Sequence, residues 1–308
     1  MKAAFPSSES AAVRAPASRR QLAGAYLSLS AATLIWASNA IAVKFALREI
    51  PQMATAAMRI TLAALTLVAL YTARGGRLRL ERQEAGKFLR VGLWGLALSF
   101  FLFTLGLNHT SVSHAVFVGA ITPLAILLFS WREGHERLSA LRLGALFISL
   151  AGVVMLAFDQ QGGASPGWEG DLLLAAGVGC FTFYTVRGKQ LAATYPSLEF
   201  NAHCFLAAAI WLFPLLVVEL ARLPWREVGW VSWSALLLSG TIGSAGAYLA
   251  YFYSLRSIQP SQAAVFHYLQ PVLGTVLGVL FFQGILTGRF LLGAAIILTG
   301  VILAECQP

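Results

Sequence analysis

The sequence predicts an all-α membrane protein in which ten transmembrane helices form two inverted five-helix repeats. Hydrophobic residues make up 58% of the 308 positions and charged residues only 11%, whereas soluble domains carry about 25% charge. Ten apolar stretches also follow one another, each near the roughly 20 residues that a helix needs to cross a bilayer. Lipid offers the backbone no hydrogen bonds, so these stretches are expected to be helical. They are Leu22–Leu47, Ala54–Tyr71, Phe88–Leu107, Val112–Trp131, Leu143–Phe158, Asp171–Val186, Leu198–Leu220, Trp230–Leu255, Ser261–Phe282 and Phe290–Ala304.

The distribution of basic residues predicts the orientation of the chain. Sixteen of the 22 Lys and Arg residues fall before the first span or in alternate loops starting with the second. Loops rich in Lys and Arg stay on the cytoplasmic side of a membrane. Both termini are therefore expected in the cytoplasm, with residues 1–21 as a disordered cytoplasmic tail.

Several classes of function lack their sequence signals. The loops are too short for a soluble catalytic or binding domain, so we expect no nucleic-acid partner. The chain has no Gly-Lys-Ser/Thr loop for ATP and no His-Glu-x-x-His metal motif. Cys180, Cys204 and Cys306 show no paired spacing and indicate neither disulfides nor a metal site. We expect no cofactor, and the implied partners are the lipid bilayer and a small-molecule substrate.

An internal repeat predicts two units of opposite orientation. Matching residues recur 148 positions apart at the end of each half and 145 apart at its start. The first repeat spans residues 22–158 and the second residues 171–304, with a periplasmic linker over 159–170. Each unit holds five spans, so the two units enter the membrane in opposite senses, as in many secondary transporters. The matched pairs include Ser113 and Ser261, Pro123 and Pro271, and Pro51 and Pro196.

The motifs at the repeat ends resemble those of a known transporter family. They read Ser113-His114-Ala115, with Glu136-Arg137-Leu138-Ser139 before the fifth span and Trp36-Ala37-Ser38-Asn39 in the first. This pattern is similar to the EamA-type branch of the drug/metabolite transporter superfamily, although Gln283-Gly284 stand where members usually keep a glutamate. The resemblance implies ten helices, a bacterial inner membrane location and export of small metabolites, amino acids prominent among them. Within that branch the chain is similar to aromatic amino acid exporters.

Paired positions of the two halves are the first candidates for substrate contacts, because they should flank the axis between the repeats. Aromatic or hydrogen-bonding groups occupy three such pairs, and Phe117 and Phe266 share a helix face with one member each. Aromatic area with a few polar groups suits an amphipathic small molecule. The alternative is ordinary helix packing for the aromatics and interhelical hydrogen bonding for the histidine. The three pairs are His114 with Gln262, Phe100 with Tyr248, and Phe103 with Tyr251.

Polar residues in the first two spans are further candidates. Trp36, Ser38 and Asn39 lie in the outer half of the first span, where Ser38 and Asn39 could bind a zwitterion or could bond a neighbouring helix. Lys44 and Arg59 are basic residues within spans. A carboxylate would be drawn to either, but snorkelling to the membrane surface is the reading that the sequence favours for both.

Two prolines mark candidate hinges. Pro123 and Pro271 fall at equivalent places within their spans. Each removes a backbone hydrogen bond, so a kink is expected there. We expect the moving helix halves of a transport cycle to meet at these points.

The acidic residues bear on energy coupling. All thirteen lie in tails, loops or span ends, whereas a proton-driven exporter commonly carries a carboxylate at membrane depth. The sequence favours uncoupled, gradient-driven passage, with coupling through a histidine as the alternative.

The resulting functional hypothesis is a carrier, not an enzyme, that exports small amphipathic metabolites by alternating access. Amino acids, including aromatic ones, are the favoured cargo, and drugs or nucleobases are the alternative. An intramembrane enzyme would need a pair such as Ser244 and His267, whose spacing matches no motif. A channel would need a continuous polar stripe, which the sequence does not show.

Overall fold

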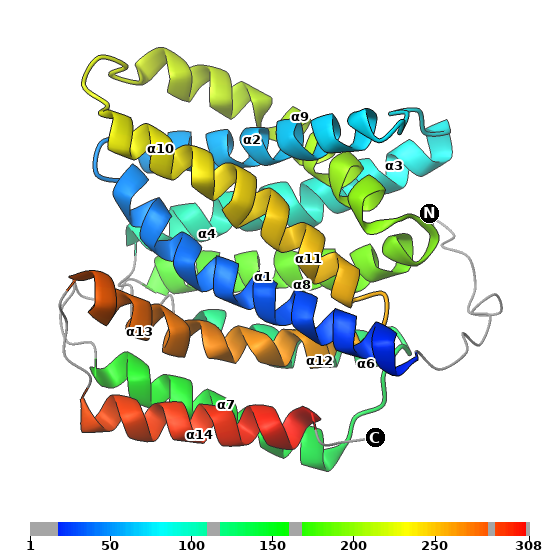
Figure 1. The fold of residues 1–308 in the computed structure, drawn as a ribbon, viewed down its shortest axis with the longest axis vertical. Coiled ribbons are helices and arrows are strands. Elements are labelled where there is room, and N and C mark those ends of the chain that lie inside the picture. The colour runs from blue at the N-terminus through cyan, green and yellow to red at the C-terminus, as the bar shows by residue number, and fades with distance from the viewer. Residues whose placement is uncertain (1–17, 110–117, 160–167, 283–286, 306–308) are drawn as a thin grey trace.

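The regular structure of the chain is helical throughout the part that the structure, a computed structural model, describes: residues 18–109, 118–159, 168–282 and 287–305 (Figure 1). This confirms the predicted all-α class. The helices are α1 (Arg19–Ala46), α2 (Gln52–Ala73), α3 (Arg82–Arg90), α4 (Leu98–His109), α6 (Thr122–Arg132), α7 (Ala140–Asp159), α8 (Trp168–Thr194), α9 (Ser197–Arg222), α10 (Trp230–Leu238), α11 (Ala247–Ser254), α12 (Pro260–Val265), α13 (Leu269–Phe282) and α14 (Gly288–Glu305).

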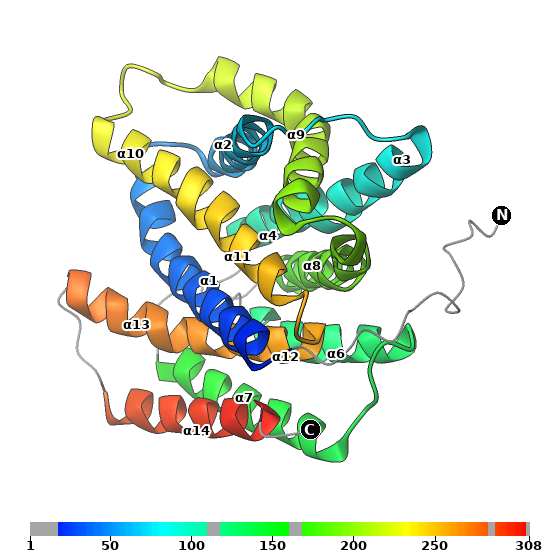
Figure 2. The ribbon, with the colours of Figure 1, turned by 45° about the vertical axis from the view of Figure 1, so that its right-hand side comes forward.

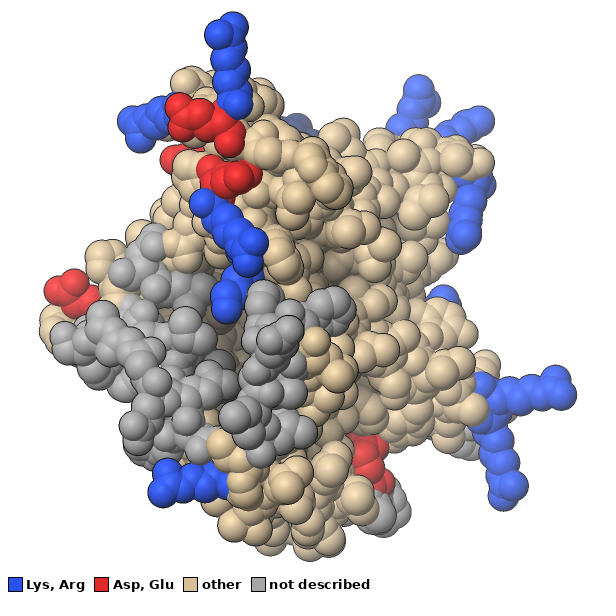
Figure 3. Space-filling model, turned by 60° about the vertical axis from the view of Figure 1, so that its left-hand side comes forward, with Lys and Arg blue, Asp and Glu red and all other residues tan. Residues whose placement is uncertain are grey.

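The outer surface of these helices is suited to lipid. Among the described residues, 6 helical segments are long and apolar enough to cross a membrane. Large apolar side chains are exposed on them, such as Leu27 at 73% and Leu65 at 63%. Trp168 and Trp230 are exposed where α8 and α10 begin, the position of tryptophans at membrane interfaces. Figure 3 shows most charged side chains near the edges of one face, with a broad uncharged band between them. The chain is therefore a multi-pass membrane protein.

Two of the predicted spans contain a π-helical segment, which the sequence analysis did not foresee. The segments are η2 (Val91–Ala97), between α3 and α4, and η3 (Ser239–Gly246), between α10 and α11. Glycines in both let a neighbouring helix come close. A Cβ added at Gly92 would lie 2.7 Å from the Ala207 Cβ of α9, and one at Gly240 would lie 2.6 Å from the Leu62 Cβ of α2.

Helices of the first half pack against helices of the second, and each of these contacts has a counterpart in which the roles of the two halves are interchanged (Figures 1 and 2). The first helix of each half packs on the third and fourth of the other: α1 on η3, α11 and α13, and α8 on η2, α4 and α6. The second helices pack on each other and on the opposite π segment, α2 on η3 and α9 on η2.

The last helices of the two halves, α7 and α14, lie side by side at one edge of the molecule in both ribbon views. Glycines allow this close approach, as is common between membrane helices. A Cβ added at Gly152 would lie 2.7 Å from the Gly293 carbonyl oxygen, and one at Gly293 would lie 2.8 Å from a Leu156 methyl group.

The helix ends differ from the predicted boundaries at the tail, at the end of the sixth span and at the linker. Ser18 and Gln21 form a capping box, so α1 begins at Arg19, inside the predicted tail 1–21. The predicted sixth span stops at Val186, but α8 continues to Thr194, because polar residues near its end do not interrupt a helix outside the lipid. The predicted linker 159–170 overlaps both neighbours: α7 ends at Asp159 and α8 begins at Trp168.

The start of α1 and the end of α14 lie at the same end of the molecule (Figure 1). The Tyr26 hydroxyl donates a hydrogen bond of 2.6 Å to the Glu305 carboxylate, which ties the first helix to the last.

Candidate functional site

An aromatic cluster lies where helices of the two halves meet. Trp36 of α1 is its centre: the ring centroid lies 5.3 Å from Tyr248, 5.2 Å from Tyr251 and 5.3 Å from His267, on which it stacks. Phe181 of α8 contacts His267 at 5.6 Å. We define the aromatic cluster as Trp36, Phe100, Phe181, Tyr248, Tyr251 and His267.

Burial within the aromatic cluster is uneven. Tyr251 is fully buried and Tyr248 is 6% exposed, because both point from α11 into the contact with α1. Trp36, Phe100 and Phe181 are only partly buried. Apolar and aromatic walls that retain accessible area inside a bundle are typical of small-molecule sites.

A second group of side chains, which is polar, comes from α1, α2 and η3 and lies beside the aromatic cluster. The Arg59 Nη2 donates to the Ser244 Oγ over 3.3 Å, and its Cζ lies 5.5 Å from the centroid of the Phe100 ring. The Asn39 side chain fills the space that a side chain at Gly243 would need. We call Asn39, Arg59 and Ser244 the polar group.

Four side-chain atoms of these two groups are buried without a hydrogen-bond partner among the described residues: Asn39 Oδ1, Arg59 Nε, Tyr251 Oη and His267 Nε2. A buried polar atom left unpaired costs about 1–3 kcal/mol. The Gln270 amide lies 2.8 Å from His267 Nδ1, so only the far side of this imidazole ring is open. Unpaired atoms that gather around one place indicate a site where a polar ligand binds.

The other predicted contact residues are scattered. Phe103 is 40% exposed, and the exposed Ser38 donates to the Leu34 carbonyl within its own helix. The Gln262 side chain accepts from the backbone N–H of Gln259, which makes it a helix cap. Phe266 lies at the edge, 6.1 Å from Tyr26. His114 and Phe117 lie outside the described residues.

The reading of Arg59 as a snorkelling residue is wrong. Its guanidinium lies between Phe100 and Ser244 in the interior, where it bonds the Ser244 hydroxyl and faces the Phe100 ring. The sequence analysis also missed Phe181, although a signal was present. Phe181 follows Trp36 by 145 positions, the repeat shift that applies to the start of each half.

The two prolines lie beside helix interruptions, and not in the middle of a helix as predicted. Pro123 is in the first turn of α6, directly after a turn at residues 120–121. Pro271 is in the first turn of α13, after the 3₁₀ turn η4 (Phe266–Tyr268). A proline fits the first turn because its missing N–H has no helical partner there. The hinge role of both residues remains a prediction.

Chemistry that needs a nucleophile or a metal finds little support in this arrangement. The Ser244 Oγ donates to the Ser239 carbonyl over 3.0 Å and accepts from Arg59, so it is not activated by His267. Within the described ranges, no group of three His, Cys, Asp or Glu side chains is placed to hold a metal ion.

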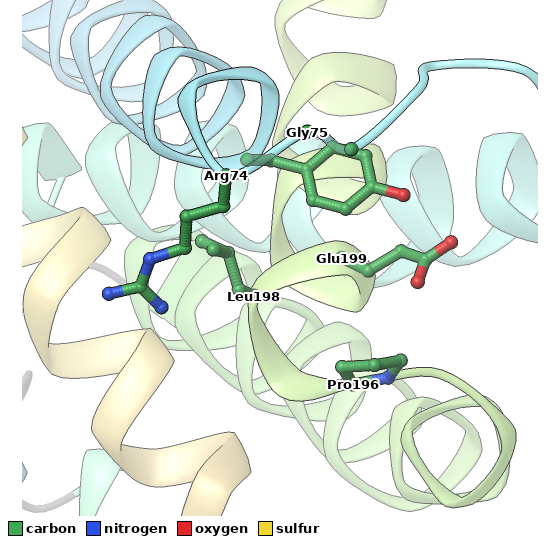
Figure 4. A pocket seen from close by; sticks show the side chains of 7 residues that line it. Arg74, Gly75, Pro196, Leu198 and Glu199 are labelled. Carbon is green, nitrogen blue, oxygen red and sulfur yellow. The ribbon is translucent and has the colours of Figure 1, made fainter.

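A pocket of about 330 Å³ lies far along α2 from the aromatic cluster, where α2 ends and α9 begins. Arg74 and Glu199 border it and point away from each other, and Gly75, Pro196 and Leu198 also line it (Figure 4). Its position at the end of two helices, outside the interior, makes it a poor candidate for a transport site.

Comparison with known proteins identifies the family. The EamA-like transporter family matches residues 23–158 and again residues 168–305. An uncharacterized transporter of Archaeoglobus fulgidus is 22% identical over 276 residues, 90% of this chain and 96% of that protein. YedA of Escherichia coli K12, named an uncharacterized inner membrane transporter, is 27% identical over 263 residues, 84% and 83% of the two chains. A solved crystal structure shares the fold, with a TM-score of 0.78 and 24% identity over 92% of this chain and 96% of that one. Both halves of the chain therefore match one family, and the protein belongs to the EamA-like transporters.

Proposed function

We propose that the protein is a carrier that exports small amphipathic metabolites, foremost amino acids including aromatic ones, by alternating access. The observation that carries this proposal is the aromatic cluster, to which both halves of the chain contribute at paired positions. Phe100 and Tyr248 are 148 residues apart, Trp36 and Phe181 are 145 apart, and all four belong to the cluster. A site on the axis between two inverted units can open to either side of the membrane.

The transport machinery in this proposal is ten spans in two inverted repeats of five. Two observations support it: equivalent helices of the two halves make equivalent contacts with the other half, and the family match covers both halves. The excess of basic residues in alternate loops supports a cytoplasmic location of both termini, which is part of this proposal. The description of YedA as an inner membrane transporter supports a bacterial inner membrane location.

We further propose that transport runs down the gradient of the cargo without proton coupling. The charged or titratable members of the aromatic cluster and the polar group are Arg59, Tyr248, Tyr251 and His267, and none is a carboxylate. Within these two groups, His267 is the side chain that could carry a coupled proton, since its Nε2 is unpaired among the described residues. A pH gradient is therefore expected to leave uptake into liposomes unchanged.

Counterflow in proteoliposomes tests this function. Vesicles that hold purified protein and a high concentration of one unlabelled compound are mixed with the same compound in labelled form. The panel contains tryptophan, phenylalanine, leucine, a nucleobase and a sugar. Transient accumulation of several apolar amino acids is the expected result. Accumulation of nucleobases alone would favour the alternative cargo. Uptake of the labelled compound that is the same with and without unlabelled compound inside the vesicles would indicate a channel.

A further inference from the structure

We propose that the polar group is an α-amino acid binding site, in which Arg59 and Ser244 bind the carboxylate of the cargo and Asn39 binds its ammonium group. The inference rests on the transporter function proposed above and narrows it to zwitterions. The aromatic cluster then receives the side chain of the cargo.

The donors of Arg59 are largely unused. A guanidinium carries five N–H donors in a planar fork that matches a carboxylate. Within the described residues, Arg59 makes one hydrogen bond, to Ser244, and its Nε is buried and unpaired. A carboxylate could accept two hydrogen bonds side by side from the remaining donors.

The charge of Arg59 also has no anionic partner among the described residues. The ion pairs found in the described part of the chain join other residues, and its polar contact is the neutral Ser244. An isolated cation taken out of water is strongly destabilised unless an anion compensates it. A bound carboxylate would supply that anion during transport, which explains why a cation remains in the interior.

Asn39 supplies the complementary acceptor. Its Oδ1 is buried without a hydrogen-bond partner among the described residues, so it can accept from an ammonium group. Its side chain abuts Gly243, and Arg59 bonds the next residue, Ser244. The two binding groups therefore meet on adjacent residues of η3, as the two charged groups of an α-amino acid require.

The aromatic cluster lies directly beside the polar group. Trp36 precedes Asn39 by three residues on α1, and Tyr248 follows Ser244 by four, so both pairs share a helix face. Phe100 contacts both sides: its ring lies 5.5 Å from the Arg59 Cζ and 6.2 Å from the Tyr248 ring. The polar group therefore matches the two charged groups of a zwitterion, and the aromatic cluster in contact with it matches an apolar side chain of the same molecule.

The test compares three compounds with one indole ring: tryptophan, tryptamine, which lacks the carboxylate, and indole-3-propionate, which lacks the ammonium group. Initial uptake rates are measured with proteoliposomes of wild type, Arg59→Gln, Arg59→Lys and Asn39→Ala. Arg289→Gln, which removes an exposed cation at the start of α14, is the matched control. Size-exclusion profiles and thermal unfolding in detergent verify the fold of each variant.

We expect Arg59→Gln to raise the half-saturating concentration of tryptophan and indole-3-propionate at least about tenfold and to leave that of tryptamine unchanged. Arg59→Lys should recover part of the loss, and Asn39→Ala should weaken tryptophan and tryptamine but not indole-3-propionate. Equal effects of Arg59→Gln on all three compounds, or no effect on tryptophan, would overturn the inference alone. A wild-type protein that moves nucleobases or sugars but no amino acid would overturn the proposed function with it.

Discussion

At the scale of single residues, the most consequential side chains are those that connect the two halves. Trp36 contacts three residues of the second half, Tyr248, Tyr251 and His267. The sequence identified Tyr248 and Tyr251 as candidates because aromatic residues recur at paired positions, and Trp36 because it stands with two polar residues in the outer half of the first span. It could not show the direction of Arg59, since a long cation can snorkel or turn inward, and neighbours distant in sequence decide between the two.

Trp36→Ala should weaken cargo binding without abolishing the fold. The substitution removes the ring at the centre of the aromatic cluster, where one aromatic contact is worth about 0.5–1.5 kcal/mol beyond its area. The half-saturating concentration of tryptophan in counterflow is expected to rise about tenfold or more. Trp230→Ala, which removes a ring that is 78% exposed, is the control and should leave this concentration unchanged. Equal behaviour of the two variants would argue against a binding role for Trp36.

Glu49 predicts a pH dependence of stability at the connection between α1 and α2. The Ser232 hydroxyl and the Gly229 N–H hold the pKa of its carboxyl below the ordinary value, and the Gly229 bond is 2.7 Å long. A pKa lowered in the folded state gives stability above the unfolded pKa, which is lost as pH falls through the folded pKa. Glu49→Gln should therefore lower the thermal midpoint at pH 7, and the difference from wild type should shrink between about pH 5 and 3. A difference independent of pH would contradict this assignment.

At the scale of helices, glycine spacing decides how closely elements approach. Helix limits were predictable from apolar runs, and eight of the ten predicted spans begin and end within about six residues of helical segments. The sixth predicted span stops at Val186, well before α8 ends at Thr194, and the first part of the fourth lies outside the described residues. The π segments were not predictable, because they depend on backbone contacts with α2, α8 and α9 across the bundle. The same holds for the turns before Pro123 and Pro271.

Gly152→Ala should destabilise the α7–α14 pair. The new methyl group would lie 2.7 Å from both the Gly293 carbonyl oxygen and an Ile297 side-chain carbon, so the helices would have to separate, at a cost of about 1–3 kcal/mol. Gly144→Ala in the same helix is the control, since nothing lies within 4 Å of its added Cβ. That change should be neutral or stabilise by up to about 1 kcal/mol. Thermal unfolding in detergent distinguishes the two, and equal midpoints would refute close packing at Gly152.

Glu136 joins the two halves at one end of the bundle. Its buried carboxylate accepts from the Ser261 hydroxyl and N–H at the start of α12 and from Arg142, 3.2 Å away, on α7. Glu136→Gln should cost about 3 kcal/mol because it leaves Arg142 half-buried without its partner. Glu133→Gln breaks the nearby pair with Arg187, whose side chains are about 20% exposed, and should cost under about 1 kcal/mol. Equal losses of stability would show that the Glu136 pair is no more than a surface contact.

At the scale of the whole molecule, each half makes an equivalent set of helix contacts with the other half, as a repeat in the sequence leads one to expect. The constant shifts of 148 and 145 residues were visible from matched prolines and serines, but which helices touch across the halves was not, because apolar faces are interchangeable in sequence. The account requires the two halves to move against each other around the aromatic cluster during transport.

A reversible cross-link between the halves tests that movement most directly. Cysteines replace Glu136 and Ser261, whose side chains are in contact, in a variant without Cys180, Cys204 and Cys306. A control carries cysteines at Glu84 and Lys87, a pair on one helix. Cross-linking of the first pair should stop tryptophan counterflow, reduction should restore it, and the control should transport in both states. Full counterflow with the two halves linked would contradict the central claim that they move relative to each other.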